Sequence, residues 1–193
     1  MEDKKELFID TDCLSCFLYT NNGSLLQRLF PNHDILVPHA VSIEIEANRR
    51  YIATSKKKKA IIDSYDHAIS NSYFQIMEDF ESDSAEFYFV MQLHGKGYDG
   101  GPSIGIGEAQ VIAAAHCREG EMASNNTRDI LYYTNKLKIK NYTASDLLYR
   151  AYVEMLESEA IIETLWSNLA NNGFLMPTKT FEEFKKRKEE KHA

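Results

Sequence analysis

Acidic side chains follow the apolar segments that this sequence presents as buried strands. Six of them fall in four separate connections between an expected strand and the helix after it: Asp10, Asp12, Glu44, Glu46, Glu108 and Asp129. Clustered carboxylates repel one another unless a proton or a cation lies between them. Carboxylate oxygens suit hard divalent cations, so the pattern predicts a site for Mg²⁺ or Mn²⁺. A metal held there can activate water and stabilise charge on a phosphoryl group.

Each of these residues also has an ordinary structural explanation when it is taken alone. Glu44 and Glu46 suit an exposed helix surface. Glu108 suits the first turn of a helix, and Asp129 suits a turn or a helix cap. Asp10 is the exception, because an aspartate that ends a buried first strand faces the edge of the sheet and needs a partner there. The prediction of one joint site therefore rests on the combined placement.

Strands alternate with helices along the chain. The expected strands are 7–10, 34–38, 73–77, 122–124 and 138–143. Segments with helical spacing of their apolar residues separate them. This alternation predicts the α/β class, with a central, mostly parallel sheet that is covered by helices on both faces. In such folds the functional groups lie beyond the carboxyl ends of the strands, which is where the acidic residues fall.

The charge balance limits the function classes. The chain has 193 residues and a formal net charge of -7, which argues against broad capture of nucleic acid by surface charge. A metal-using enzyme of nucleic acids stays open, because a bound divalent cation supplies local positive charge. The block Lys56 to Lys59 is expected to be the solvated start of a helix, with a phosphate contact as the alternative. With no membrane-spanning apolar run and no signal peptide, we expect a cytoplasmic protein and no membrane partner.

Four short motifs occur in order in the first 142 residues: FIDTDCL, VPHAVSIEI, GEAQVIAAAH and SNNTRDI. Together they resemble the motifs of the PIN-domain ribonucleases, and in particular of the VapC-type toxins of bacterial toxin–antitoxin pairs. Each motif alone is degenerate, and it is their order that gives them specificity. The resemblance implies a PIN-like three-layer α/β/α nuclease domain at 1–142. The segment 143–193 is then a helical C-terminal extension packed on the same domain.

The motifs assign roles to individual residues by resemblance. The implied catalytic residues and metal ligands are Asp10, Glu44, Glu108 and Asp129. The implied supporting residues are Thr11, Asp12, Ser124, Asn126 and Arg128. The two hydroxyls are expected to bond metal ligands or the scissile phosphate. Asn126 is expected to orient Asp129 or Asp10 through its amide. Arg128 is expected either to hold a phosphate or to be a solvated helix residue.

The fourth motif can be read in two registers. With Ser124 in the first position of the toxin motif, SNNTRDI contains an intact site that ends at Asp129. Many other PIN proteins place an acid directly after the serine or threonine. In that register Asn125 is a lost ligand. The presence of Asp129 favours the first register.

The resemblance implies a metal-dependent endoribonuclease that cleaves single-stranded RNA with water activated by Mg²⁺ or Mn²⁺. It also implies a homodimer and a cognate antitoxin, as for the toxin of a toxin–antitoxin pair. One alternative is a catalytically silent PIN-fold protein that binds nucleic acid or acts as a scaffold. Another is a haloacid-dehalogenase-type phosphatase with Asp10 as nucleophile and Asp12 as acid and base. That reading leaves Glu44 and Glu108 unexplained.

The glycine-rich stretch GYDGGPSIGIG precedes Glu108. It does not match a Walker phosphate-binding loop, and it lacks the strand and spacing of a dinucleotide-binding fingerprint. We expect either a flexible lip over the acidic cleft or an ordinary loop.

Overall fold

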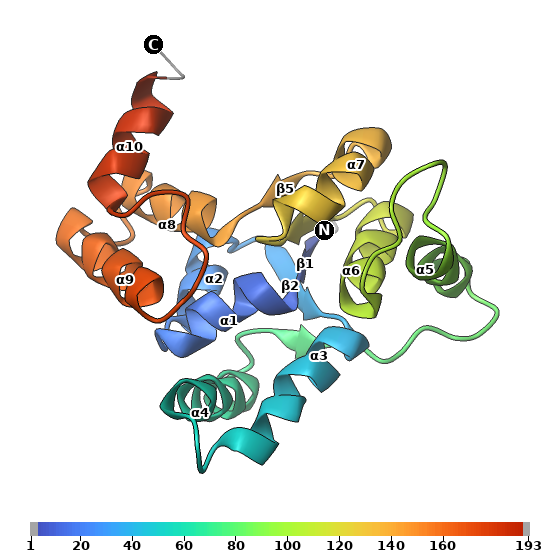
Figure 1. The fold of residues 1–193 in the computed structure, drawn as a ribbon, viewed down its shortest axis with the longest axis horizontal. Helices are drawn as coiled ribbons and strands as arrows, with labels where there is room; N and C mark the ends of the chain where they lie inside the picture. Colours follow the sequence, from blue (N-terminus) through green and yellow to red (C-terminus); the bar gives the residue numbers. More distant parts are fainter. Residues whose placement is uncertain (1–3, 191–193) are drawn as a thin grey trace.

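Five parallel strands form one sheet in the computed structural model, which describes residues 4–190 (Figure 1). The strands are β1 (Lys5–Ile9), β2 (His33–Val37), β3 (Gln75–Ile76), β4 (Glu121–Ala123) and β5 (Asn141–Tyr142). Their order in the sheet is β3-β2-β1-β4-β5, and every neighbouring pair is parallel. The predicted α/β class with a parallel sheet is confirmed.

The central strand β1 explains why the first apolar run is so uniform. Leu7, Phe8 and Ile9 are all completely buried, as expected of a parallel strand that is covered on both faces. After β1 the chain builds β2 and β3 on one side and then returns to build β4 and β5 on the other. The strand order therefore reverses between β1 and β4, and the ends of these two strands are where such folds carry their sites.

Helices enclose the sheet. They are α1 (Thr11–Tyr19), α2 (Gly23–Leu29), α3 (His39–Glu46), the 3-10 helix η1 (Ala47–Tyr51), α4 (Lys56–Ser70), α5 (Ala85–Gly95), α6 (Ile106–Cys117), α7 (Thr127–Leu137), α8 (Ala144–Val153), α9 (Glu159–Asn171) and α10 (Phe181–Glu190). α1 and α2 lie on one side of the strands, and α5 and α6 lie on the other (Figure 1). Within residues 4–190, no helix combines the length and the apolar character that crossing a membrane requires.

The C-terminal helices pack through their aromatic side chains. Trp166 on α9 is completely buried and contacts the rings of Phe181 and Phe184. Its indole nitrogen donates a 3.1 Å hydrogen bond to the carbonyl of Thr178. These residues belong to the same hydrophobic core as β1, and α8 contacts α1 and α2. The division of the chain at 142 and 143 stays a prediction.

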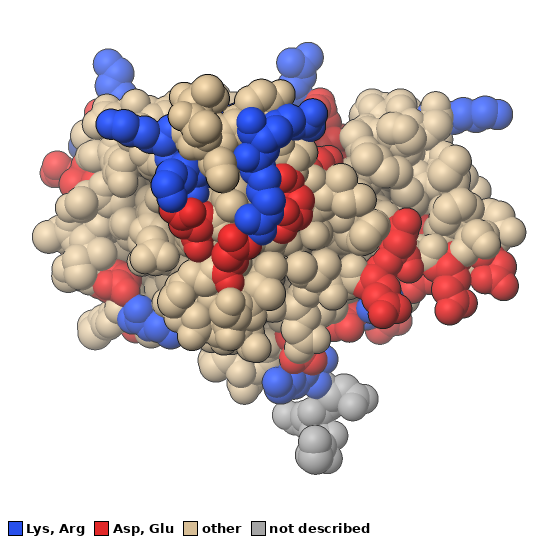
Figure 2. Space-filling model, turned by 90° about the horizontal axis from the view of Figure 1, so that it is seen from below, with Lys and Arg blue, Asp and Glu red and all other residues tan. Residues whose placement is uncertain are grey.

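One face of the molecule shows how surface charge is distributed. Figure 2 shows cationic and acidic side chains interleaved on the side of η1 and α4, while acidic side chains gather toward the side of α5. Two of the cations on η1 and α4 form ion pairs. Arg49 contacts both Glu46 and Asp66, and Lys59 lies 2.6 Å from Asp63. These two cations are therefore already neutralised by their neighbours.

Candidate active site

The carboxyl edge of the sheet contains a small acidic cavity of about 270 Å³. Its lining residues are Asp10, Thr11, Asp12, Glu44, Gly105 and Glu108. They come from three places in the chain: the start of α1, the last turn of α3, and the start of α6. The structure thus brings together three of the four predicted metal ligands, together with two predicted supporting residues.

Asp10 is the most buried of the four acids that line this cavity. It is the N-cap of α1 and only 4% exposed. One carboxylate oxygen accepts a 2.8 Å hydrogen bond from the backbone N–H of Thr11, and the other accepts a 2.8 Å bond from the hydroxyl of Ser124. Burial is the main cause that raises the pKa of Asp10 to about 7. The charges of Glu108 and Asp12 also raise this pKa, whereas the two hydrogen bonds lower it. A buried carboxyl with this pKa needs either a proton or a cation near neutral pH.

Glu44 reaches the cavity from α3 and lies against the start of α6. Its carboxylate accepts a hydrogen bond from the hydroxyl of Thr11. A Cβ atom added at Gly107 would lie 2.8 Å from Glu44 Oε1, so the close approach depends on a glycine at that position. Glu46 is instead paired with Arg49. Of the two glutamates, Glu44 lines the acidic cavity and Glu46 does not.

Glu108 is held by its own helix and by the segment after β4. One oxygen accepts a 3.0 Å bond from the backbone N–H of Gly105. The other accepts a hydrogen bond from the side-chain amide of Asn126. The same amide nitrogen lies 3.0 Å from Oδ2 of Asp129. Asn126 therefore joins Glu108 to Asp129, which is exposed on the first turn of α7 and does not line the acidic cavity.

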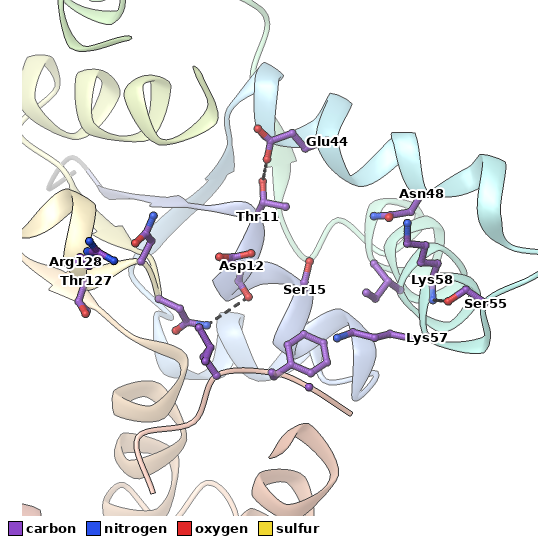
Figure 3. Close-up of a pocket in the computed structure, with 16 residues that line it drawn as sticks. Thr11, Asp12, Ser15, Glu44, Asn48, Ser55, Lys57, Lys58, Thr127 and Arg128 are labelled. Atoms are coloured by element: carbon purple, nitrogen blue, oxygen red, sulfur yellow. Dashed lines mark hydrogen bonds between the residues drawn. The ribbon is translucent and has the colours of Figure 1, made fainter. Parts of the chain in front are cut away.

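A larger cavity of about 730 Å³ adjoins the acidic one and shares Thr11, Asp12 and Glu44 with it. Figure 3 shows Arg128 on one side of this cavity and Lys57 and Lys58 on the other, with the shared residues between them. The segment 173–175, from the connection between α9 and α10, completes the lining. The site therefore has an acidic floor between cationic walls.

Within residues 4–190, no Lys, Arg or His nitrogen lies within 4.0 Å of a carboxylate oxygen of the acidic cavity. Among the described residues, the ion pairs involve other carboxylates and none reaches Asp10, Asp12, Glu44 or Glu108. Oxygen donors gathered without an ion pair match the preference of Mg²⁺ and Mn²⁺.

The side chains as placed do not form a ready ligand cage. Within residues 4–190, no group of three or more His, Cys, Asp or Glu side chains is arranged to hold a metal ion. Glu44 and Glu108 each accept hydrogen bonds from the protein's own donors. The donor chemistry fits a hard cation, but these two carboxylates would have to exchange their present partners to bind it.

Some contacts near the site could not be predicted from the sequence. Asn125, a lost ligand in the alternative register, has a structural role: its side-chain oxygen accepts a 2.8 Å bond from the backbone N–H of Ala144 at the start of α8. The glycine-rich stretch forms a loop that is tied to α7, because the hydroxyls of Tyr132 and Tyr133 donate to the carbonyls of Asp99 and Pro102. The adjacent pair Tyr132 and Tyr133 can be seen in the sequence, but the sequence does not indicate which residues their hydroxyls contact.

No protein-family model matches the chain, and no curated protein matches it either. Among solved structures, the chain is similar to one in the crystal structure of VapBC2 from Rickettsia felis bound to a DNA fragment from their promoter. The sequence identity is 20% and the TM-score is 0.49, over 72% of this chain and 98% of the other. A likeness at this level does not establish a family, so the assignment from the four motifs stays a prediction.

Proposed function

We propose that this protein is a metal-dependent nuclease that hydrolyses phosphodiester bonds of single-stranded RNA. The observation that carries the proposal is the group of four carboxylates, without cationic partners among the described residues, around one cavity at the carboxyl edge of the sheet. One of them, Asp10, is deeply buried and has a pKa raised to about 7. Perturbed carboxylates that gather in a cleft are typical of catalytic sites.

Asp10, Glu44 and Glu108 are the residues that would hold Mg²⁺ or Mn²⁺. When bound, such an ion lowers the pKa of a water ligand and stabilises negative charge on a phosphoryl group. Hydrogen bonds from the protein orient these carboxylates. Ser124 and the backbone N–H of Thr11 fix both oxygens of Asp10, while the N–H of Gly105 fixes one oxygen of Glu108.

In the proposed site, Asp129 is linked to the other carboxylates by Asn126. The amide of Asn126 contacts both Glu108 and Asp129, so it can set the direction of both carboxylates. Arg128 lies on the wall of the larger cavity, where a guanidinium can bind a phosphate of the substrate strand.

The phosphatase alternative accounts for less of the site. It would use Asp10 and Asp12, but it gives no role to Glu44 and Glu108, which line the same cavity. The silent binding protein is the stronger rival, because the carboxylates within residues 4–190 are not arranged as a ready ligand cage. It does not account for a buried aspartate whose pKa is raised to about 7 and which has no cationic partner among the described residues.

The motif resemblance extends the proposal to a toxin that acts as a homodimer with a cognate antitoxin. That extension is supported by the motifs and not by the contacts of the acidic cavity. Co-expression of the chain with its neighbouring open reading frames, followed by measurement of cell growth, tests it directly. Growth arrest that one neighbour relieves supports the extension, and normal growth on expression of the chain alone contradicts it.

The enzymatic proposal is tested with purified protein and single-stranded RNA in the presence of Mn²⁺ or Mg²⁺. We expect cleavage that is abolished by EDTA and by Asp10→Asn. The melting temperature should rise with Mn²⁺ in the wild type and not in Asp10→Asn. If Mn²⁺ neither supports cleavage nor raises the melting temperature, the catalytic proposal is wrong and the binding protein remains.

A further inference from the structure

The lysine block at the start of α4 divides into two pairs. Lys57 and Lys58 are partly buried and line the larger cavity, whereas Lys56 and Lys59 are exposed and do not line it. Lys59 is paired with Asp63. The sequence shows four equal lysines, and only two of them face the candidate site.

Lys57 is held in place by the C-terminal part of the chain. Its Nζ donates a 2.8 Å hydrogen bond to the carbonyl of Asn172 and lies 3.7 Å from the centre of the Phe174 ring. The Phe174 ring in turn packs on Tyr19 of α1, with ring centres 5.2 Å apart. A carbonyl and an aromatic face thus fix the direction of a long side chain that would otherwise sample many rotamers.

The fixed ammonium group has capacity left for a ligand. An ammonium has three N–H donors, and the carbonyl of Asn172 uses one of them. The pKa of Lys57 is lowered, because burial lowers it more than the nearby Cys16 and Asp12 raise it. The cation therefore lies partly desolvated at the wall of a cavity whose floor includes Asp12 and Glu44. An anion that enters the cavity gains a strong contact there, because charge-assisted hydrogen bonds strengthen away from bulk water.

We propose that Lys57, positioned by Phe174 and Asn172, binds a backbone phosphate of the RNA strand beside the phosphate at the acidic cavity. This inference rests on the proposed nuclease function and adds to it a binding site built in part by the segment after α9. A strand that crosses the larger cavity meets Arg128 on one wall and Lys57 on the other. The connection between α9 and α10 then takes part in substrate binding.

The first test measures binding of a fluorescent single-stranded RNA oligonucleotide to the full chain in the Asp10→Asn background, across a range of salt concentrations. Lys57→Gln should weaken binding at low salt by about tenfold, the usual scale for a hydrogen bond to a charged group. It should also make the slope of log affinity against log salt shallower by about 0.7, the loss of one phosphate contact on a single strand. Lys57→Arg should keep most of the affinity and the slope.

Lys56→Gln is the matched control, because it removes the same charge from the adjacent residue, which does not line the cavity. Melting temperatures of all variants identify any that fail to fold. In the otherwise wild-type enzyme, Lys57→Gln should raise KM and leave kcat nearly unchanged.

Phe174→Ala tests whether the ring acts through Lys57. If it does, Phe174→Ala should weaken binding nearly as much as Lys57→Gln, and the double variant should be no weaker than the more severe single one. Losses that multiply would mean that the ring contacts RNA by itself, and the positioning role would be wrong.

The outcomes separate the two proposals. Equal salt slopes for Lys57→Gln and Lys56→Gln, together with metal-dependent cleavage by the wild type, overturn the phosphate site and leave the nuclease. Absence of RNA binding and of cleavage overturns both.

Discussion

The hydroxyl of Ser124 donates a 2.8 Å hydrogen bond to Oδ2 of Asp10, and both side chains are buried. The two residues follow β4 and β1, the neighbouring strands between which the strand order reverses. Because the bond stabilises the ionised carboxylate, it keeps the pKa of Asp10 below the value that burial alone would set. Ser124 therefore controls the protonation of the central acid of the candidate site.

Ser124→Ala should raise the pKa of Asp10 further. Since a proton and a metal ion compete for the same carboxylate, the pH at which Mn²⁺ gives half of its full increase in melting temperature should move upward by about one unit. Ser124→Thr, which keeps a hydroxyl, should move it less. The measurement is a melting curve with and without Mn²⁺ at a series of pH values. An unchanged midpoint in Ser124→Ala would show that the hydroxyl does not tune the acid.

The raised pKa of Asp10 also predicts how stability depends on pH without metal. Between the ordinary pKa of 3.8 and about 7, the folded protein keeps a proton on Asp10 that the unfolded chain has released. The free energy of unfolding should therefore fall as pH rises through this window, by roughly 1.4 kcal/mol for each pH unit, and level off above it.

Asp10→Asn cannot titrate at this position and provides the comparison. Urea unfolding in EDTA at pH 5 and pH 8 should show that the wild type loses more stability than Asp10→Asn over this interval. Parallel losses in the two proteins would mean that Asp10 is ionised throughout.

Gly107→Ala should separate metal binding from stability. The added Cβ would meet Oε1 of Glu44 at 2.8 Å, and Glu44 can move away because the contact is with the end of a flexible side chain. The cost to folding should be small, since alanine favours a helix over glycine by about 1 kcal/mol. The displaced carboxylate should weaken Mn²⁺ binding, seen as a smaller rise in melting temperature and slower RNA cleavage.

Gly95→Ala is the control for this substitution. A Cβ at Gly95, near the end of α5, would meet no atom within 4 Å. It should leave both the Mn²⁺ effect and cleavage unchanged. If Gly107→Ala behaves in the same way, the close approach of Glu44 to Gly107 is not needed for metal binding.

Much of the fold could be predicted because parallel strands carry a simple signal. Buried runs such as Leu7 to Ile9 are apolar on both faces, and each expected strand overlaps an observed one. Strand lengths were less predictable. The expected strand 138–143 is observed only at Asn141–Tyr142, and Lys138 instead ends α7 in a left-handed conformation with φ of 56°. Such a turn depends on packing and was not visible in the residue types.

The candidate site, too, could be predicted only in part. Asp10, Glu44 and Glu108 could be expected together, since the carboxyl ends of parallel strands share one edge of the sheet. The contact of Lys57 with Asn172 and Phe174 could not, because it joins residues more than a hundred positions apart through one loop conformation. Side-chain contacts of this range follow from the tertiary structure and leave no local pattern.

Asn126 provides the last prediction, which also tests the register of SNNTRDI. Its amide contacts Glu108 and Asp129, so Asn126→Ala and Asp129→Asn should disturb the same unit. Each should slow RNA cleavage by about 10- to 100-fold, the usual effect of residues that orient metal ligands. The double variant should be little slower than the slower single one. Asp83→Asn, on the exposed segment before α5, should have no effect. Normal cleavage by Asp129→Asn would show that Asp129 has only a structural role in the first turn of α7. Asn126 would then be the last residue of the motif that cleavage requires.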